Sequence, residues 1–146
     1  MHRPLDTRSL FRLFQNNVKP YVKLGLAKLI LGLDAYSIDG VGWGIIFATA
    51  EDRRVKISFR EHNYSMRSIE YYNGSGDADR DAANGPAKIY YDADGSVLGE
   101  EYWRSSYLHR PACDGPAVTL YGTDYRREEY WENGLQLFSE PLYSRI

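Results

Sequence analysis

Apolar residues near the start of the chain recur at the spacing of α-helices. A capping residue, Asp6 or Thr7, precedes four apolar side chains, which predicts a helix running to about Asn16. A proline suits the first turn of a helix, so a second helix is predicted over Pro20–Leu31. We expect this pair of short helices to cover one face or one end of a sheet.

From about residue 39 the pattern changes to the alternation that is typical of β-strands. In VKISF, residues 55–59, every second side chain is apolar, and together with the strand-like run at residues 41–50 this segment predicts a hairpin. SIEYY, residues 68–72, predicts the next strand. Residues 73–85 are rich in Gly, Asp and Asn and are expected to form the longest loop.

Beyond this point the chain repeats itself. A Glu-Tyr-aromatic triplet begins at Glu70, Glu101 and Glu129, at intervals of 31 and 28 residues, and Gly-Pro-Ala begins at Gly85 and Gly115. Repeats of this period are typical of stacked architectures. Because proline donates no ladder hydrogen bond, each Gly-Pro-Ala belongs at the entry of a strand. Each unit is therefore predicted to be a hairpin, with successive hairpins side by side in one meandering sheet.

These elements predict a single α+β domain spanning all 146 residues. Residues 1–38 form its helical segment and residues 39–146 its antiparallel sheet of hairpin repeats. Aromatic residues make up 14% of the chain, and 13 of them are tyrosines, which favour strands because the ring packs on a pleated surface while the hydroxyl stays hydrated. A chain of this length can bury a sufficient core without disulfides.

Two segments of the repeat region resemble a known family. YWRSSYLHRPACDGPAVTLYG and YWENGLQ are similar to MORN-type repeats, particularly their divergent bacterial and phage variants. The resemblance covers about residues 55–138 and is most specific in LHRPACDGPA, residues 108–117. RSSY at residues 104–107 departs from it by replacing an Asn-Gly turn, and GTDY at residues 122–125 lacks an Asp-Gly. The resemblance implies an interaction scaffold, in some variants in toxin–antitoxin settings, and so implies binding rather than catalysis.

Charge and cysteine content exclude several classes of function. The net charge of -2 gives no general attraction to nucleic acid or to an anionic membrane. The single cysteine, Cys113, allows no intramolecular disulfide and no cysteine-cluster metal site, and it suits a reducing cytoplasm. The most apolar stretch, residues 22–33, is too short to span a bilayer and contains two lysines. No cofactor is predicted.

Histidines and the cysteine offer the main candidates for catalysis or metal binding. HRPACD brings His109, Cys113 and Asp114 within six residues, but a Cys-His nucleophile needs mutual contact and an orienting group. Since this segment opens a repeat, a structural role is the favoured interpretation. A metal site from His2, His62 and His109 would require three distant segments to converge, which the spacing does not support.

Two charged segments also invite a functional interpretation. Asp77, Asp79 and Asp81 alternate as in an EF-hand loop, but Ala82 occupies the position where that loop needs glycine. An acidic surface loop able to contact a basic partner is the favoured interpretation. YRREEYW, residues 125–131, mixes arginines with aromatic rings that can stack on single-stranded nucleic acid. Its two glutamates favour a cross-strand charge ladder instead.

The sequence thus favours a non-enzymatic protein-binding module. Its most concrete form is a small phage or bacterial inhibitor, antitoxin or anti-defence protein that acts by steric occlusion, because aromatic residues and arginine are frequent interface anchors. The alternative is a small ligand, glycan or nucleotide base stacked on an aromatic sheet face, and an enzyme using His109 or Cys113 is a third hypothesis. A free sheet edge can also pair with a second copy to give a homodimer. The predicted interaction residues are Tyr102, Trp103, Tyr130, Trp131, Arg126, Arg127, Asp77, Asp79 and Asp81.

Overall fold

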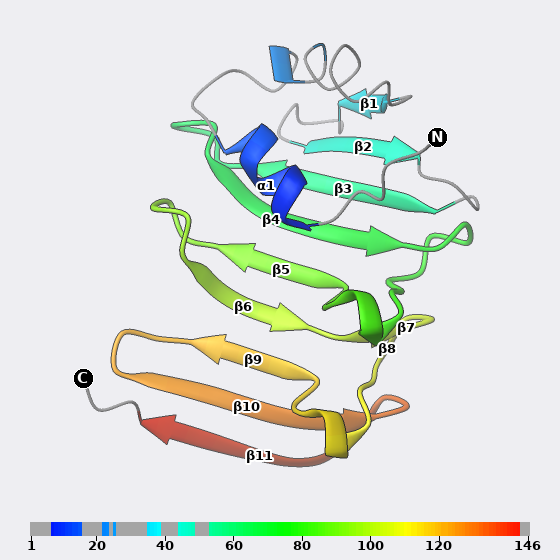
Figure 1. Cartoon of the computed structure of the whole chain (residues 1–146), viewed down its shortest axis with the longest axis vertical. Coiled ribbons are helices and arrows are strands. Elements are labelled where there is room, and N and C mark those ends of the chain that lie inside the picture. Colours follow the sequence, from blue (N-terminus) through cyan, green and yellow to red (C-terminus); the bar gives the residue numbers. More distant parts are fainter. Residues whose placement is uncertain are drawn as a thin grey trace.

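One antiparallel sheet of nine strands dominates the molecule (Figure 1). The structure is a computed structural model that describes residues 7–15, 22–23, 25, 35–38, 44–48 and 53–143. The strands follow one another across the sheet in chain order, except that a small two-stranded hairpin, β7–β8, is inserted between β6 and β9. The elements are α1 (Thr7–Phe14), β1 (Ala35–Ile38), β2 (Gly44–Ala48), β3 (Arg54–Phe59), β4 (Met66–Tyr72), β5 (Lys88–Tyr91), β6 (Val97–Glu101), β7 (Trp103–Arg104), β8 (Tyr107–Leu108), β9 (Val118–Tyr121), β10 (Tyr125–Glu132) and β11 (Leu135–Tyr143), with short 3₁₀ helices η2 (Ala82–Asn84) and η3 (Ala112–Asp114).

The predicted meander of antiparallel hairpins is confirmed. β2 and β3 pair as the first hairpin, and β5 and β9 begin directly after Ala87 and Ala117, so each Gly-Pro-Ala does stand at a strand entry. Both alanines are fully buried. The first predicted helix is confirmed as α1, two residues shorter at its end than expected. The second, over Pro20–Leu31, lies largely outside the described residues and stays a prediction.

The hydrophobic core lies between α1 and the half of the sheet formed by β2 to β5. Leu10 and Phe14 of α1 are fully buried in one cluster with the inward side chains of β2, β3, β4 and β5. α1 lies across β3 and β4 in Figure 1. We call this side of the sheet the helix-bearing face. The helix positions at 10 and 14 pack inward because residues four apart lie on the same side of a helix.

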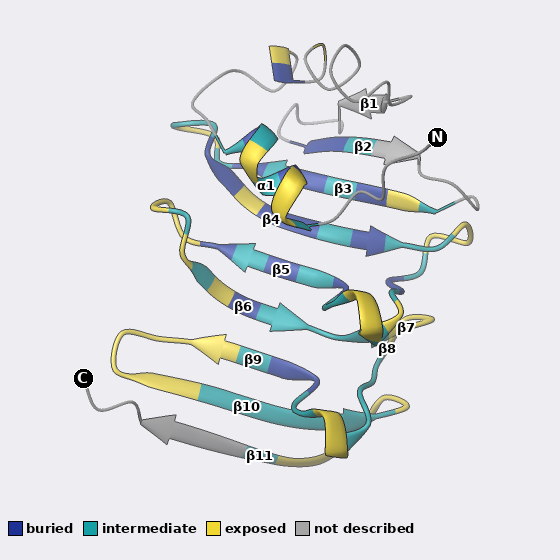
Figure 2. Cartoon of the chain, viewed as in Figure 1, coloured by how far each residue is buried: buried dark blue, intermediate teal, exposed yellow. Residues whose placement is uncertain are grey.

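Along the helix-bearing face, one row of directly opposed residues changes character midway. The row begins as four isoleucines on β2 to β5, each the cross-strand partner of the next. It continues as Glu100 on β6, Thr119 on β9 and Glu128 on β10. Figure 2 shows the same change, with buried residues concentrated in β2 to β5 and mostly exposed or half-buried ones in β9 and β10, apart from the buried start of β9 at Val118. The core therefore covers only the first half of the sheet.

The opposite side of the sheet, the back face, explains the Glu-Tyr-aromatic triplet. Residues two apart in a strand point to the same face, so the glutamate and the third residue meet there. Trp103 Nε1 donates to Glu101 Oε1 at 3.0 Å, and Trp131 Nε1 donates to Glu129 Oε1 at 3.0 Å. The middle tyrosine points to the helix-bearing face. Each triplet thus places one aromatic ring on either side of the sheet.

Successive copies are joined by the same backbone hydrogen bonds. Ser106 N donates to Ala78 O at 2.9 Å, and at the next junction Gly134 N donates to Leu108 O at 2.9 Å. In the same way the amides of the two repeat arginines, residues 80 and 110, bind the carbonyls of the tryptophans that follow, residues 103 and 131, at 3.2 and 3.0 Å. Each hairpin is therefore held in register by its neighbour.

Candidate functional site

The first Gly-Pro-Ala copy builds a compact arrangement on the helix-bearing face. The guanidinium carbon of Arg80 lies 3.9 Å from the ring centroid of Tyr71, and Arg80 Nη1 donates to Pro86 O at 3.0 Å. Gly85 has φ of 119°, and a Cβ there would lie 3.1 Å from Arg80 Nη1. The glycine therefore supplies both a backbone conformation that is nearly exclusive to glycine and room for the guanidinium.

The second copy repeats this arrangement closely. The guanidinium carbon of Arg110 lies 4.1 Å from the ring centroid of Tyr102, and Arg110 Nη1 donates to Pro116 O at 3.2 Å. Gly115 has φ of 128°, and a Cβ there would lie 2.8 Å from Arg110 Nη1. The arginine of the sequence motif HRPACD is thus a stacking partner for a tyrosine, held at a fixed position on the sheet.

The two copies differ in what covers them. In the first, Thr7 at the start of α1 lies 3.0 Å from the hydroxyl of Tyr71 and accepts a hydrogen bond from Arg80 Nη1 at 3.3 Å. No side chain in the described parts of the chain makes the equivalent bonds to Tyr102 and Arg110. Within the same parts of the chain, Arg110 Nε is buried with no hydrogen-bond partner. Among the described residues, no helix covers Tyr102 and Arg110 as α1 covers Tyr71 and Arg80, and we call each of these two tyrosine–arginine surfaces a seat.

The part of the helix-bearing face beyond β5 is the candidate site, and we call it the open face. Tyr91, which packs under Phe11 with ring centroids 4.9 Å apart, is 5% exposed, whereas its counterpart Tyr121 is 39% exposed. Phe138 on β11 is 47% exposed and stacks on Tyr130, with centroids 4.2 Å apart and an interplanar angle of 17°. The open face consists of Glu100, Tyr102, Thr119, Tyr121, Arg126, Glu128, Tyr130 and Phe138.

Two carboxylates, Glu100 and Glu128, lie on the open face beside two arginines, Arg110 and Arg126. Glu100 occupies the position of Ile69 in the first copy, and its partial burial raises its pKa, although Arg110 opposes this shift. Glu128 forms an ion pair with Arg126 at 3.0 Å and accepts a hydrogen bond from the hydroxyl of Tyr130 at 3.1 Å. A partly desolvated carboxylate among aromatic rings favours a cationic group as its ligand.

The aromatic and arginine residues predicted from the sequence divide between the two faces. Tyr102, Tyr130 and Arg126 lie on the open face. Trp103 and Trp131 bind glutamates on the back face, where Arg127 also donates to Glu129 Oε2 at 3.1 Å. Neighbouring residues of a strand cannot share a face. The single aromatic face expected from these residues is therefore corrected to two faces.

Sequence reasoning missed three residues of the open face, Glu100, Tyr121 and Phe138. A comparison of the two copies position by position would have identified the first, because it replaces Ile69 of an otherwise apolar row. Tyr121 aligns with Tyr91 and differs only in exposure, which depends on where α1 lies. Phe138 has no counterpart in the copies, so no sequence signal marked it.

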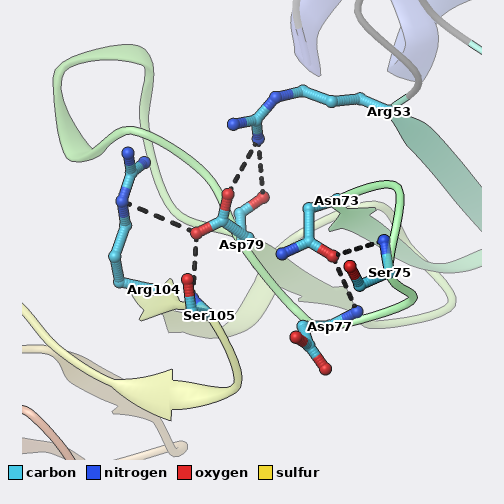
Figure 3. Close-up of polar contacts among 7 residues, drawn as sticks. All are labelled: Arg53, Asn73, Ser75, Asp77, Asp79, Arg104 and Ser105. Carbon is cyan, nitrogen blue, oxygen red and sulfur yellow. Dashed lines mark hydrogen bonds and ion pairs between the residues drawn. The ribbon is translucent and has the colours of Figure 1, made fainter.

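The predicted acidic surface loop is wrong at Asp79, which is 4% exposed. Figure 3 shows its carboxylate between two arginines, with Oδ2 3.0 Å from Arg53 Nη1 and Oδ1 3.6 Å from Arg104 Nε. Asp79 Oδ1 also accepts a hydrogen bond from Ser105 N at 2.9 Å. Two cations from distant parts of the chain and one amide thus compensate the cost of burying this charge.

The rest of the loop is held by its own side chains. Asn73 Oδ1 accepts hydrogen bonds from the amides of Ser75 and Asp77, both at 3.0 Å (Figure 3). Asp81 caps η2 by accepting from Ala83 N at 3.0 Å. Of the three aspartates, Asp81 is exposed and Asp77 is half-buried. The loop therefore offers a partner the carboxylates of Asp77 and Asp81, but not that of Asp79.

His109 and Cys113 lie apart in function. His109 is the counterpart of Asp79, and its Nδ1 accepts a hydrogen bond from Asn133 N at 2.9 Å, so both residues anchor the next turn. Cys113 is exposed, with its sulfur 3.9 Å from Asp114 Oδ1. His2 lies outside the described residues. In the described ranges, no group of three or more His, Cys, Asp or Glu side chains is placed to hold a metal ion.

Comparisons with protein-family models, with curated proteins and with solved structures found no match to this chain. The resemblance to MORN-type repeats therefore stays a prediction from the sequence. Within the part of the chain that the structure describes, no helix has the length and apolar character needed to cross a membrane.

Proposed function

We propose that the protein is a binding module that holds a protein partner on its open face. The observation that supports this function is the contrast between the two copies of one surface. α1 covers the first copy and buries Tyr91, whereas Tyr121 at the equivalent place is exposed. Surfaces where aromatic rings and an arginine gather are typical interface anchors. A partner bound here in the cytoplasm would have its own surface occluded, as expected of an inhibitor or antitoxin.

The position of Glu100 supports a role of this residue in binding, because the residue does not favour the stability of the fold. A carboxylate at the position of an isoleucine violates the apolar pattern of its row and carries a desolvation cost in the folded chain. Residues that break a local rule in this way are typical of functional sites. We propose binding rather than catalysis, because His109 Nδ1 accepts a hydrogen bond from a backbone amide, whereas Cys113 is exposed on the 3₁₀ helix η3 with its sulfur next to Asp114.

A glycan or nucleotide base is the second candidate partner. The exposed ring of Tyr121 near the carboxylate of Glu100 offers stacking together with a hydrogen-bond acceptor, which suits a sugar or a base. A protein partner remains our choice, since the rings extend from the end of β6 across β9 and β10 to β11, a spread that suits the area of a protein interface.

The test is affinity capture with the tagged full chain and two matched variants. Tyr121 and Leu120 are neighbours on opposite faces with exposures of 39% and 38%. We expect the parent chain to retain one protein in stoichiometric amount from a lysate of its source cells. Tyr121→Ala should reduce that retention at least tenfold, and Leu120→Ala should leave it unchanged.

Equal retention by both variants would contradict the open face as the binding surface. Retention of no protein, together with a saturable change in tryptophan fluorescence on titration with oligosaccharides or nucleosides, would replace the protein partner by the small ligand.

A further inference from the structure

We infer that the partner contributes a basic amphipathic helix, docked over the second copy as α1 is docked over the first. This inference rests on the proposed function and names the chemistry of the partner. Four features of the structure support it: the equivalence of the two seats, the bonds at the start of α1, the charge of Glu100 and the condition of the β11 edge.

The first step is the equivalence of the two seats. Tyr71 and Tyr91 contact α1 about one turn apart, at Thr7 and Phe11. Their counterparts in the second copy are Tyr102 and Tyr121, in the same Glu-Tyr-aromatic and Gly-Pro-Ala contexts. The arginine–tyrosine stacks agree to within 0.2 Å, at 3.9 and 4.1 Å. A helix that follows the course of α1 therefore meets two tyrosines at the same spacing.

The second step concerns the start of the helix. The Thr7 hydroxyl bridges the phenol of Tyr71 and the guanidinium of Arg80. At the second copy Tyr102 and Arg110 present the same pair, and no side chain of the described residues takes the place of Thr7 there. The docking helix is thus expected to begin with Ser, Thr or Asp, the residues that also cap helices best.

The charge of Glu100 indicates which residue the partner helix carries at the place of Leu10. Leu10 of α1 packs in one cluster with Ile69 and Ile89. On the open face the residues that correspond to these isoleucines are Glu100 and Thr119, and Thr119 lies opposite Glu128. Glu128 is already paired with Arg126, whereas Glu100 forms no ion pair among the described residues. A leucine would desolvate the Glu100 carboxylate further, whereas a lysine or arginine would pair with it. The partner helix is therefore expected to carry a basic residue where α1 carries Leu10.

Two elements of a second copy of this chain, its α1 and its β11 edge, are excluded as the partner. α1 of a second copy is committed to its own sheet, where Leu10 and Phe14 are fully buried. The outer edge of β11 is interrupted, because Pro141 lies opposite Arg127 and has no N–H. The carbonyl of Glu129 accepts a hydrogen bond from Ala117 N, so the backbone N–H and C=O of Arg127, two residues away, also point to β9. Pro141, opposite Arg127, therefore directs its nitrogen away from β10 to the outer edge.

The test uses two helical peptides and the full chain. Both are stapled peptides of about 16 residues, because shorter unconstrained helices are marginal in water. Each begins with threonine and carries phenylalanine at the place of Phe11, and they differ in lysine or glutamate at the place of Leu10. We expect the lysine peptide to shift the amide resonances of β6, β9 and β10 and to bind at least tenfold more tightly than the glutamate peptide.

A variant with the residues of the first copy provides the second arm. Glu100→Ile with Thr119→Ile should weaken the lysine peptide at least tenfold while the chain stays folded, because isoleucine is accepted at both places in the first copy. Glu61→Gln, which removes a carboxylate from an exposed turn, is the matched control and should leave binding unchanged.

Equal affinity for the two peptides, or shifts confined to the back face, would overturn the inference. If the captured protein depends on Tyr121 but not on Glu100 and Thr119, the binding module stands and the basic helix is wrong. If Tyr121→Ala also leaves capture unchanged, the proposed function fails with it.

Discussion

At the scale of single residues, the open face differs from the core by a few substitutions. The first copy has Ile69 and Ile89 where the second copy has Glu100 and Thr119. The surface that packs against Leu10 in the first copy is therefore polar in the second. Other residues are fixed by structure alone: Gly115 by its φ of 128° and by the guanidinium of Arg110 next to it. Removing Glu100 should therefore alter function and stability in opposite directions.

Glu100→Gln should stabilise the free protein in a pH-dependent way. Burial raises the pKa of Glu100, so its carboxyl group holds its proton more tightly in the folded chain than in the unfolded one. The stability that this protonated carboxyl provides is complete below the ordinary carboxyl pKa and is lost as the pH rises through the raised value. Urea unfolding should show little difference between variant and parent at pH about 4 and a more stable variant at pH about 7.

Glu61→Gln serves as the control, because this side chain is exposed in a turn. A constant difference between Glu100→Gln and the parent across this pH range would show that Glu100 is well hydrated in the folded protein.

At the scale of elements, α1 covers one half of the sheet, and among the described residues no other helix covers the second half. α1 contributes Phe14, whose ring centroid lies 6.1 Å from that of Phe59 inside the core. Phe138 on β11 belongs to the second half and contacts Tyr130 across one strand pair. Substitution of Phe14 and of Phe138 therefore compares how tightly the two halves of the sheet are packed.

Phe14→Ala should destabilise the chain by about 3–5 kcal/mol, the usual cost of emptying a core phenylalanine site. Phe138→Ala should cost about 0.5–1.5 kcal/mol, since only a stacked pair is lost. Both values come from urea unfolding followed by circular dichroism. A similar loss for the two variants would mean that β11 is packed as tightly as α1.

Much of this level was predictable from the sequence. The alternation in residues 55–59 and the Gly-Pro-Ala triplets located strands and hairpins correctly, because these signals are local. The faces of Tyr102 and Trp103 were confused because the triplet was treated as one unit rather than as alternating positions. Asp79 was misplaced because its partners Arg53 and Arg104 come from a distant strand and from the next copy.

At the scale of the whole molecule, stability should decline from β2–β5 towards β10–β11. The core cluster is confined to α1 and β2–β5, and regions with few buried apolar contacts open at lower free energy. One end of this continuous sheet therefore carries the folding core, and the other end carries the surface that we propose for binding.

Native-state hydrogen exchange tests this gradient. Amides of β3 to β5 should exchange at least tenfold more slowly than those of β10 and β11, and a bound partner should slow β9 to β11 selectively. Uniform exchange across the nine strands would indicate that the sheet opens only as a single cooperative unit.

The identical hydrogen bonds at the two junctions have a consequence for how such a chain can change in length. Ser106 N donates to Ala78 O just as Gly134 N donates to Leu108 O. A copy of about 30 residues therefore supplies a donor for the preceding copy and an acceptor for the next one. Tandem duplication of the coding segment would therefore lengthen the sheet by one hairpin without any new joint, and would add a second exposed tyrosine–arginine seat. Under the proposed function, such a duplication would raise the number of binding surfaces per chain while leaving the core of α1 and β2–β5 unchanged.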